Sequence, residues 1–295
     1  MPDHARGPRR TALYVPATNA KALSKLSGLA PDVVIVDLED SVAPERKDEA
    51  RESVREIVRA RPGGAAEWVV RINALSTPGG AEDLLAAVAA RPDAILIPKV
   101  DGPRDVIELD DALDEMDVSK RVGIWTMIET PRAVLNLGGL AELGRDPAAR
   151  LDGFVAGLND LAKLTGARLT RDRRNLLPHL AQIVLAARAG GFSAFDSASN
   201  DFRDLDAFGE ECRQGAELGF DGKTLIHPAQ LGPCEKAFSP SDADVARALA
   251  IRAAFAAPDA AGKGAIQLDG EMVERLHLDQ AEALLSRAGI KGDPS

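Results

Sequence analysis

Eight short apolar runs with amphipathic helical patterns between them, and polar residues at the ends of the runs, predict an α/β fold, a TIM (β/α)8 barrel. The 295 residues are enough for one such barrel plus a C-terminal helical extension or lid. We expect the barrel over residues 1–238 and the extension over 239–295, both within one domain.

The predicted strands are short, apolar and rich in β-branched residues. Continuous apolar runs of about four to eight residues are typical of parallel strands buried on both faces. The predicted strands are residues 12–15, 33–36, 68–72, 94–97, 123–128, 153–156, 192–195 and 224–226. Eight strands alternating with helices suggest that the sheet closes into a barrel.

Proline, glycine and the spacing of apolar residues mark the helices. Proline is well tolerated in the first turn of a helix, where its missing N–H would have no partner inside the helix. We expect helices at 44–60 and 80–90, helices that open at Pro103 and Pro131, and further helices at 175–189, 205–218, 242–257 and 272–287. The last two form the C-terminal extension.

Composition excludes several classes of protein. With 45% hydrophobic and 28% charged residues the chain reads as an ordinary globular protein. It has neither an apolar run near the ~18 residues of a membrane span nor the apolar core of a signal peptide, so we expect a cytoplasmic protein without membrane contact. The net charge of −10 argues against nucleic-acid binding, and Cys212 and Cys234 lack the spacing of a zinc ribbon.

Polar side chains follow seven of the predicted strands and would converge on one mouth of the barrel. In chain order they include Asp37, Glu39, Asp40, Arg71, Asn73, Lys99, Glu129, Asn159, Asp160, Asp196 and His227. Any one of them could simply cap a helix or hold a turn. Together, a carboxylate-rich mouth that contains Arg71 and Lys99 predicts a site for a hard cation and an anionic substrate, with Asn73 as a further substrate contact.

Glu129 and Asp160 are the candidate metal ligands, because they follow adjacent strands at similar heights. Mg²⁺ favours one or two carboxylates and completes its shell with water and substrate oxygens, and Mn²⁺ is the alternative ion. Zinc is disfavoured because the four histidines include no pair with ligand spacing.

Basic residues concentrate in the first two strand–helix units. They are Arg9, Arg10, Lys21, Lys25, Arg46, Lys47 and Arg51. One interpretation is a solvated helix face paired with neighbouring acids at helical spacing. The other is a docking site for the phosphates of a coenzyme A arm.

Seven segments, taken in order, resemble one known family. They are Arg10-Thr-Ala-Leu-Tyr-Val-Pro16, Val36-Asp-Leu-Glu-Asp-Ser-Val42, Arg71-Ile-Asn73, Ile97-Pro-Lys99, Met127-Ile-Glu-Thr130, Gly157-Leu-Asn-Asp160 and Gly219-Phe-Asp-Gly-Lys-Thr-Leu-Ile-His-Pro228. The chain resembles the citrate lyase β-subunit-like branch of the HpcH/HpaI aldolase/citrate lyase family, and is similar to malyl-CoA and citramalyl-CoA lyases.

The resemblance implies a Mg²⁺-dependent barrel enzyme, commonly a homotrimer or hexamer. Such a carbon–carbon lyase would cleave or form a 3-hydroxyacyl-CoA thioester such as malyl-, citramalyl- or citryl-CoA by retro-Claisen chemistry. By resemblance, the metal ligands are Glu129 and Asp160, the substrate-binding arginine is Arg71, and the contacts to the thioester arm are Arg10, Lys21 and Lys47.

The predicted catalytic set is Arg71, Asp37 and an acid from the C-terminal extension. Lyases of this family often have an aspartate two positions after a methionine in that extension, and this chain has Glu274 there. The side chain keeps its carboxyl group but is one methylene longer, and Asp269 is a nearby substitute.

Three other functions stay open from the sequence. The first is a citrate lyase β subunit that acts on a thioester carried by an acyl carrier protein. The second is an aldolase that acts on free 2-keto acids, and the third is a non-catalytic subunit that binds a thioester.

Overall fold

The computed structural model describes residues 7–64, 67–146, 148–260 and 262–290, so the expected domain ends at residues 1 and 295 lie outside the described ranges. The chain divides into two compact units, Met1–Glu235 and Lys236–Ser295. Their boundary lies near the one expected after residue 238. Membership of the extension in the barrel's domain stays a prediction.

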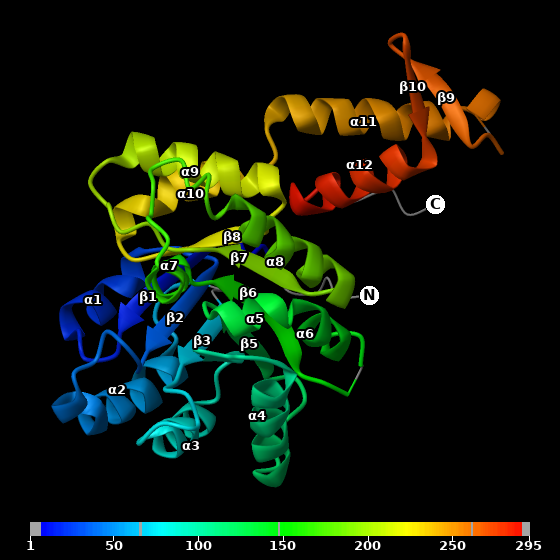
Figure 1. The fold of residues 1–295 in the computed structure, drawn as a ribbon. Coiled ribbons are helices and arrows are strands. Elements are labelled where there is room, and N and C mark those ends of the chain that lie inside the picture. The colour runs from blue at the N-terminus through cyan, green and yellow to red at the C-terminus, as the bar shows by residue number, and fades with distance from the viewer. Residues whose placement is uncertain (1–6, 65–66, 147, 261, 291–295) are drawn as a thin grey trace. The chain divides into compact units, whose positions relative to one another are not determined.

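The first unit is a closed barrel of parallel strands, which confirms the predicted fold class (Figure 1). The strands are β1 (Thr11–Pro16), β2 (Val33–Asp37), β3 (Glu67–Arg71), β4 (Ala94–Ile97), β5 (Gly123–Ile128), β6 (Leu151–Ala156), β7 (Ser193–Asp196) and β8 (Gly222–Leu225). Each pairs with the next in sequence, and β8 pairs with β1 to close the sheet.

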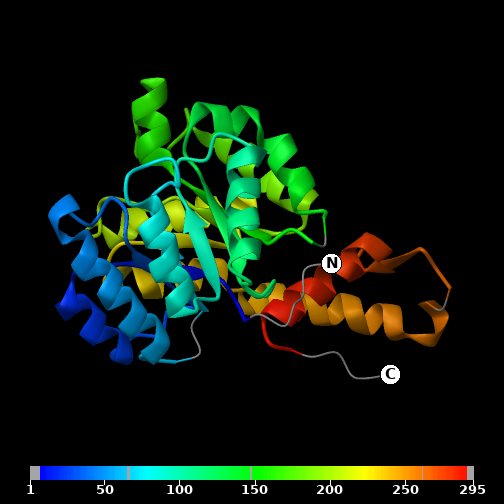
Figure 2. The same ribbon diagram turned by 90° about the horizontal axis from the view of Figure 1, so that it is seen from below.

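Helices surround the strands of this unit (Figure 2). The α-helices are α1 (Ala20–Lys25), α2 (Lys47–Ala60), α3 (Gly80–Ala90), α4 (Pro103–Glu115), α5 (Pro131–Leu135), α6 (Leu137–Leu143), α7 (Leu158–Thr165), α8 (Leu177–Gly190), α9 (Leu205–Leu218) and α10 (Leu231–Phe238), which spans the boundary. Short 3-10 turns are η1 (Leu26–Gly28), η2 (Pro44–Arg46) and η3 (Pro228–Gln230). No helix in the described ranges has the length and apolarity needed to span a membrane.

The inside of the barrel is filled with side chains, so it is a packed core. Alternate residues of each strand point inward. The buried cluster that they form is Ala12, Val33, Ile35, Val69, Ala94, Leu96, Trp125, Met127, Val155 and Phe195, with Tyr14 packed against it. The rings of Trp125 and Phe195 stack with their centroids 4.4 Å apart.

An arginine covers the amino-terminal end of this core. Arg9 precedes β1, and its guanidinium pairs with Glu67 at 2.7 Å and with Asp152 at 2.6 Å. The same group lies 5.1 Å from the ring centroid of Trp125. Arg9 thus packs against the core at the amino-terminal ends of the strands, and the polar residues of the predicted site lie at the opposite ends.

The second unit consists of α11 (Asp242–Ala256), η4 (Pro258–Ala260), the antiparallel strands β9 (Ala265–Leu268) and β10 (Glu271–Glu274), and α12 (Arg275–Arg287). Helices α11 and α12 lie side by side (Figure 1). Val273 and Leu285 belong to the apolar cluster that joins these elements.

The prediction of one helix over 272–287 is wrong in its first three residues. Leu268 pairs with Glu271, and the two residues between them, Asp269 and Gly270, have φ values of 52° and 87°. A two-residue Asp-Gly loop with positive φ at both positions is typical of a tight β-hairpin. Met272 therefore lies in a strand, and the helix begins at Arg275.

Candidate active site

Several polar residues at the mouth of the barrel share the inward face of their strand with residues of the barrel core. On β2, Asp37 follows the inward Val33 and Ile35, and on β3 Arg71 follows Val69. Because the side chains of a strand alternate between its two faces, Asp37 and Arg71 point into the barrel at its carboxyl end. On β5, Trp125 and Met127 point inward, and Glu129, two residues after Met127, points into the barrel in the same way.

Arg71 is held from several sides. Its Nε and Nη2 donate to the two carboxylate oxygens of Asp37, each at 2.6 Å. Nη1 donates to the sulfur of Met127 at 3.5 Å and forms an ion pair with Glu39 at 3.0 Å. The guanidinium carbon lies 4.8 Å from the ring centroid of Tyr14. Of the five guanidinium N–H groups, only the second one on Nη2 has neither a hydrogen-bond acceptor nor an ion-pair partner among the described residues.

Asp37 orients Arg71 and has no free oxygen for a substrate. Besides Arg71, its carboxylate accepts hydrogen bonds from the backbone N–H groups of Glu39 at 2.9 Å and Ser41 at 3.2 Å. Burial acts to raise the pKa of Asp37, but the charge and hydrogen bonds of Arg71 lower it below the ordinary value. The structure thus places Asp37 as the partner that orients Arg71, and its catalytic role stays a prediction.

Glu39 connects Arg71 to Lys99. Its side chain is buried, one oxygen lies 3.0 Å from Arg71, and the other pairs with the ammonium group of Lys99. Burial raises the pKa of Glu39. Lys99 also lies 3.4 Å from Asp40, so the carboxyl ends of β2, β3 and β4 are joined by alternating charges.

Glu129 is a buried carboxylate with one strong hydrogen bond. Its Oε1 accepts from the backbone N–H of Lys99 at 2.7 Å. Burial, together with the nearby charges of Glu39 and Asp160, raises the pKa of Glu129 to about 7. Gly157 leaves room for this side chain, because an added Cβ would overlap the Cβ of Glu129 and lie 2.7 Å from its Oε2.

A cavity of about 410 Å³ opens at this end of the barrel. Its walls include Tyr14, Arg71, Met127, Glu129 and Asp160, together with Ser197, Asn200 and Thr224 of the last two strand ends. No group of three or more His, Cys, Asp or Glu side chains in the described ranges is arranged to hold a metal. Two carboxylates beside an open cavity nevertheless fit Mg²⁺, which keeps several waters and takes oxygens from its substrate.

Two predicted substrate contacts have partners in the fold. The ammonium group of Lys47 donates to the carbonyl oxygens of Leu38 at 2.5 Å and Glu39 at 2.8 Å. The side-chain amide of Asn73 donates to the same Leu38 carbonyl at 3.0 Å and to Asp83 at 2.5 Å. Both side chains line an adjacent hollow of about 590 Å³ and shape the loop after β2.

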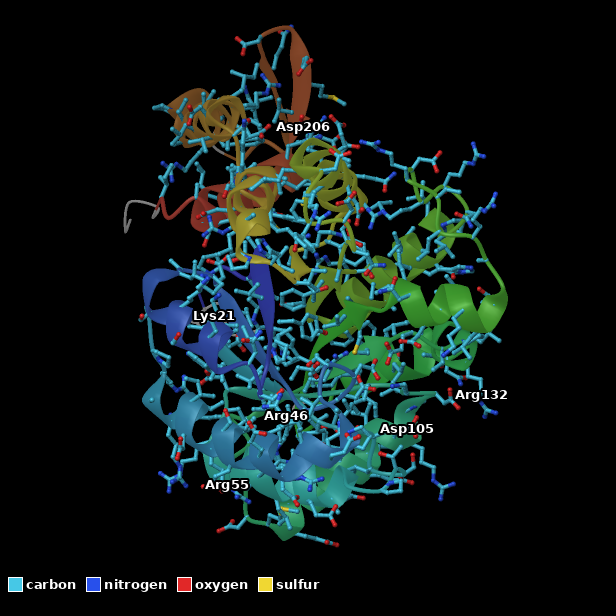
Figure 3. All side chains as sticks on the ribbon, turned by 90° about the vertical axis from the view of Figure 1, so that its left-hand side faces the viewer. Lys21, Arg46, Arg55, Asp105, Arg132 and Asp206 are labelled. Atoms are coloured by element: carbon cyan, nitrogen blue, oxygen red, sulfur yellow. The ribbon has the colours of Figure 1, made fainter. Side chains whose placement is uncertain are left out.

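Arg10 precedes β1, at the end of the barrel opposite the cavity, and its contact with the thioester arm stays a prediction. Its guanidinium donates to both carboxylate oxygens of Asp32, which precedes β2, at 3.0 Å each. Lys21 is exposed on α1, after the carboxyl end of β1, and has no ion pair within the described ranges (Figure 3). A role for Lys21 stays a prediction.

Arg46 in η2 and Arg51 in α2, two residues of the basic cluster, have acidic partners. Arg46 pairs with Glu49 at 2.6 Å, and Arg51 pairs with Asp48 and with the buried Asp83, both at 2.8 Å. The pairs with Glu49 and Asp48 fit the interpretation of an ion-paired helix face, and the pair with Asp83 joins α2 to α3, while docking of phosphates stays a prediction.

Two further polar strand ends do not line the cavity. Asp196 is fully buried and pairs with Arg173 at 2.8 Å and Lys223 at 3.0 Å. His227 is exposed, and its ring stacks on Phe202 with centroids 4.7 Å apart.

The sequence interpretation missed Tyr14 and Met127 as parts of the site. Tyr14 is the only tyrosine of the chain, and Met127 lies two residues before Glu129. The alternation of β1 would have found Tyr14, since Ala12 and Tyr14 share the inward face.

Glu274 ends β10 and caps α12 in the second unit. Its backbone N–H donates to Nδ1 of His277 at 2.9 Å. Its carboxylate has no ion pair in the part of the chain that the structure describes. Asp269 lies in the hairpin turn and contacts Arg247 at 3.3 Å, so Glu274 is the better candidate for the acid.

Comparison with known proteins identifies the family. The model of the HpcH/HpaI aldolase/citrate lyase family matches residues 10–228, which include all the strands of the barrel and every cavity residue named above. The chain belongs to the HpcH/HpaI aldolase/citrate lyase family. The predicted family and its lyase class are confirmed.

Relatives in this family match almost the whole chain. A protein named (3S)-malyl-CoA thioesterase from Cereibacter sphaeroides is 40% identical over 97% of this chain and 96% of its own. A mitochondrial citramalyl-CoA lyase from Rattus norvegicus is 31% identical over 98% of this chain and 88% of its own. The structure of CitE from Mycobacterium tuberculosis, in complex with magnesium, acetoacetate and coenzyme A, has 32% identity, covers 97% of this chain and 100% of its own, and gives a TM-score of 0.79.

Proposed function

We propose that this chain is a Mg²⁺-dependent carbon–carbon lyase that cleaves or forms a 3-hydroxyacyl-CoA thioester such as malyl-, citramalyl- or citryl-CoA. The observation that carries the proposal is the cavity lined by Arg71, Glu129 and Asp160. The citramalyl-CoA lyase relative and the CitE complex with magnesium and coenzyme A support this substrate class.

Glu129 and Asp160 would hold the metal, and Mn²⁺ would bind in the same way. A bound Mg²⁺ would supply a Lewis acid and a template for the substrate oxygens. The carboxylate of Glu129 is costly to ionise in its buried setting, and a cation beside it would offset that cost.

Retro-Claisen cleavage breaks the bond between the α carbon of the thioester and the carbon that bears the hydroxyl group. The hydroxyl would give its proton to a water molecule and become the carbonyl of a keto acid, while the electron pair of the broken bond forms the thioester enolate. Arg71 would donate the second N–H of its Nη2 to the oxygen that becomes the carbonyl, in an orientation that Asp37 fixes in advance. Glu274 is the proposed acid that protonates the enolate carbon.

Hydrolysis of the thioester is the second candidate function, because the 40% identical relative is named a thioesterase. It would release free coenzyme A and leave the carbon skeleton of the acid intact. A thioester on an acyl carrier protein is the alternative substrate form, and a homotrimer or hexamer is the proposed assembly.

Turnover of malyl-, citramalyl- and citryl-CoA with and without Mg²⁺ tests the proposal. Glu129→Ala and Asp160→Ala should abolish Mg²⁺-dependent turnover, while Glu115→Ala, which removes an exposed carboxylate from α4, should not. Equal turnover in a chelator, or an active Glu129→Ala variant, would contradict it. If only a carrier-protein thioester is turned over, the alternative partner is correct.

A further inference from the structure

The backbone of Lys99 is in a conformation that lysine rarely adopts. Its φ is +53°, in the left-handed region where a side chain crowds the backbone and where glycine, and to a lesser extent asparagine, are favoured. Two of the other five non-glycine residues with positive φ, Arg61 and Arg91, directly follow a helix, where this conformation is common. Lys99 instead follows strand β4 at the mouth of the barrel.

This conformation places the backbone N–H of Lys99 against the proposed metal ligand. The N–H donates to Oε1 of Glu129 at 2.7 Å, and it is the one hydrogen bond to that carboxylate within the described ranges. A hydrogen bond from a neighbouring group orients a carboxylate before the metal arrives. The orientation of Glu129 therefore depends on the turn at Lys99.

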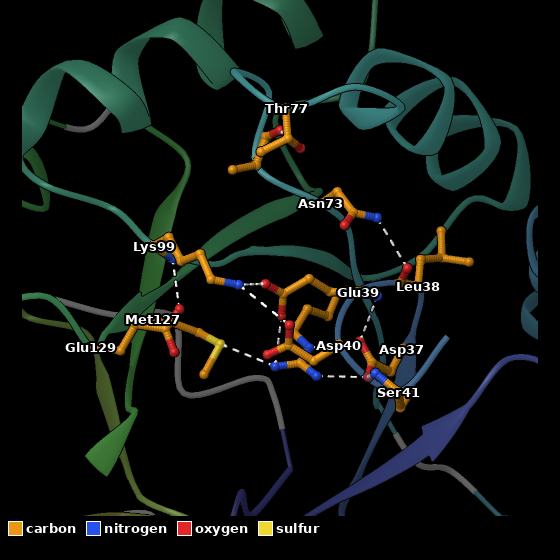
Figure 4. A network of polar contacts seen from close by, with 12 residues as sticks. Asp37, Leu38, Glu39, Asp40, Ser41, Asn73, Thr77, Lys99, Met127 and Glu129 are labelled. Atoms are coloured by element: carbon orange, nitrogen blue, oxygen red, sulfur yellow. Dashed lines mark hydrogen bonds and ion pairs between the residues drawn. The ribbon is translucent and has the colours of Figure 1, made fainter. Parts of the chain in front are cut away.

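The side chain of Lys99 is anchored across the mouth on the β2 side. Its ammonium group pairs with Glu39, whose side chain is only 4% exposed, and lies 3.4 Å from Asp40 (Figure 4). Glu39 is itself fixed by Arg71 at 3.0 Å. The lysine side chain is thus held at one end by a buried acid and at the other by the strained backbone.

We propose that Lys99 is a positioning residue for the metal ligand Glu129: its ion pair with Glu39 holds the left-handed turn that aims its N–H at the Glu129 carboxylate. The inference rests on the proposed metal site. It gives Lys99 a role in positioning Glu129, in place of the direct substrate contact expected from the sequence.

Four substitutions of Lys99 separate the effect of its ammonium group from the effect of its backbone conformation. Lys99→Gly and Lys99→Asn remove the ammonium group, but both residues tolerate positive φ and keep the N–H in place. Lys99→Ala and Lys99→Gln also remove the ammonium group, but both favour negative φ and turn the N–H away from Glu129. Far-UV circular dichroism and thermal unfolding establish that each variant is folded. Each class contains two variants, so the comparison can still be made if one of them fails to fold.

Binding of Mn²⁺ to each full-length variant, measured by the EPR signal of the free ion, gives a readout that needs no turnover. We expect Lys99→Gly and Lys99→Asn to bind Mn²⁺ within about threefold of the wild type. Lys99→Ala and Lys99→Gln should bind about 10- to 100-fold more weakly, as is typical when a partner of a metal ligand is lost.

Equal Mn²⁺ affinity in all four variants, or an equal loss in all four, would overturn the inference while leaving the metal site standing. If KM for the CoA thioester rises equally in all four variants while Mn²⁺ affinity is unchanged, Lys99 contacts the substrate and does not position the metal ligand. If the wild type does not bind Mn²⁺, the proposed metal site fails, and the role of Lys99 fails with it.

Discussion

Asp37 and Arg71 are register partners on β2 and β3, and their side chains form a two-pronged ion pair with both N–O distances at 2.6 Å. The pair is almost fully buried. Two adjacent strands thus fix the guanidinium plane before a substrate arrives, and such preorganisation is a main source of electrostatic catalysis.

Asp37→Asn should lower both activity and stability. The amide cannot balance the buried charge of Arg71, and breaking a buried ion pair typically costs about 3–5 kcal/mol in the free energy of unfolding. We expect a fall in kcat of at least about 100-fold, from misplacement of Arg71 by about 1 Å. Urea unfolding and steady-state kinetics measure the two effects, and a variant with normal kcat would show that Arg71 does not need this partner.

Metal affinity should rise with pH through neutrality. The pKa of Glu129 is raised from 4.5 to about 7, so in the absence of metal the folded protein holds a proton that the unfolded chain releases. The contribution of Glu129 to the free energy of unfolding therefore falls as pH rises from 4.5 to about 7. Metal binding must displace the proton from the Glu129 carboxyl group. Titration of Mn²⁺ between about pH 5.5 and 8.5 should show affinity rising and then levelling above about pH 7.

Glu129→Gln is the control for this prediction, because it removes the titrating group. It should bind Mn²⁺ weakly and without the same pH dependence. A flat pH profile in the wild type would mean that Glu129 is not a ligand.

Gly157→Ala should weaken metal binding without unfolding the barrel. The φ of Gly157 is −115°, which alanine accepts, but the new Cβ would displace the Glu129 side chain. We expect Mn²⁺ affinity to fall about tenfold or more. Gly138→Ala on α6 is the matched control, since its Cβ would meet no atom within 4 Å. Equal affinity in both variants would show that the Glu129 side chain can move freely.

Lys223→Met should destabilise the barrel at neutral pH and reduce its sensitivity to acid. Lys223 is fully buried and pairs with Asp196 at 3.0 Å and Glu211 at 2.7 Å. Loss of the cation leaves a buried negative charge less compensated, at a typical cost of about 3–5 kcal/mol in the free energy of unfolding. Thermal unfolding measures this cost, and an unchanged Tm would mean that Arg173 alone compensates Asp196.

The pH dependence of this network follows from Asp196. Burial acts to raise the pKa of Asp196, but Lys223 and Arg173 lower it below the ordinary value. The stabilisation is present above the ordinary aspartate pKa, about 3.9, and is lost as pH falls through the lowered pKa of the folded state. The wild type should therefore lose more stability in acid than Lys223→Met does.

The sequence predicted the barrel well because its strands are buried on both faces. Each predicted strand overlaps an observed one, and helix α9 has the predicted bounds 205–218. The hairpin of the second unit was missed because Met272 and Val273 fit a helical pattern as well as a strand. The Asp269-Gly270 pair was the local signal that could have decided between them.

The site was predictable only where strand geometry determines it. Residues at the carboxyl ends of strands, such as Arg71 at the end of β3 and Glu129 directly after β5, fall at the cavity, because a parallel barrel brings these ends together. Arg10 precedes its strand, so the same geometry puts it at the opposite end of the barrel, and its role rests on the resemblance alone. The pairing of Lys99 with Glu39 depends on a positive φ that a lysine gives no reason to expect.

The products formed from one CoA thioester distinguish the proposed carbon–carbon cleavage from hydrolysis of the thioester bond. Incubation of the purified protein and Mg²⁺ with malyl-CoA, or with whichever ester of the panel reacts fastest, should be followed by NMR of all carbon-containing products. The account predicts a keto acid and a shorter acyl-CoA in equal amounts, with the thioester bond intact. Free coenzyme A together with the uncleaved hydroxy acid would contradict it and make the protein a thioesterase.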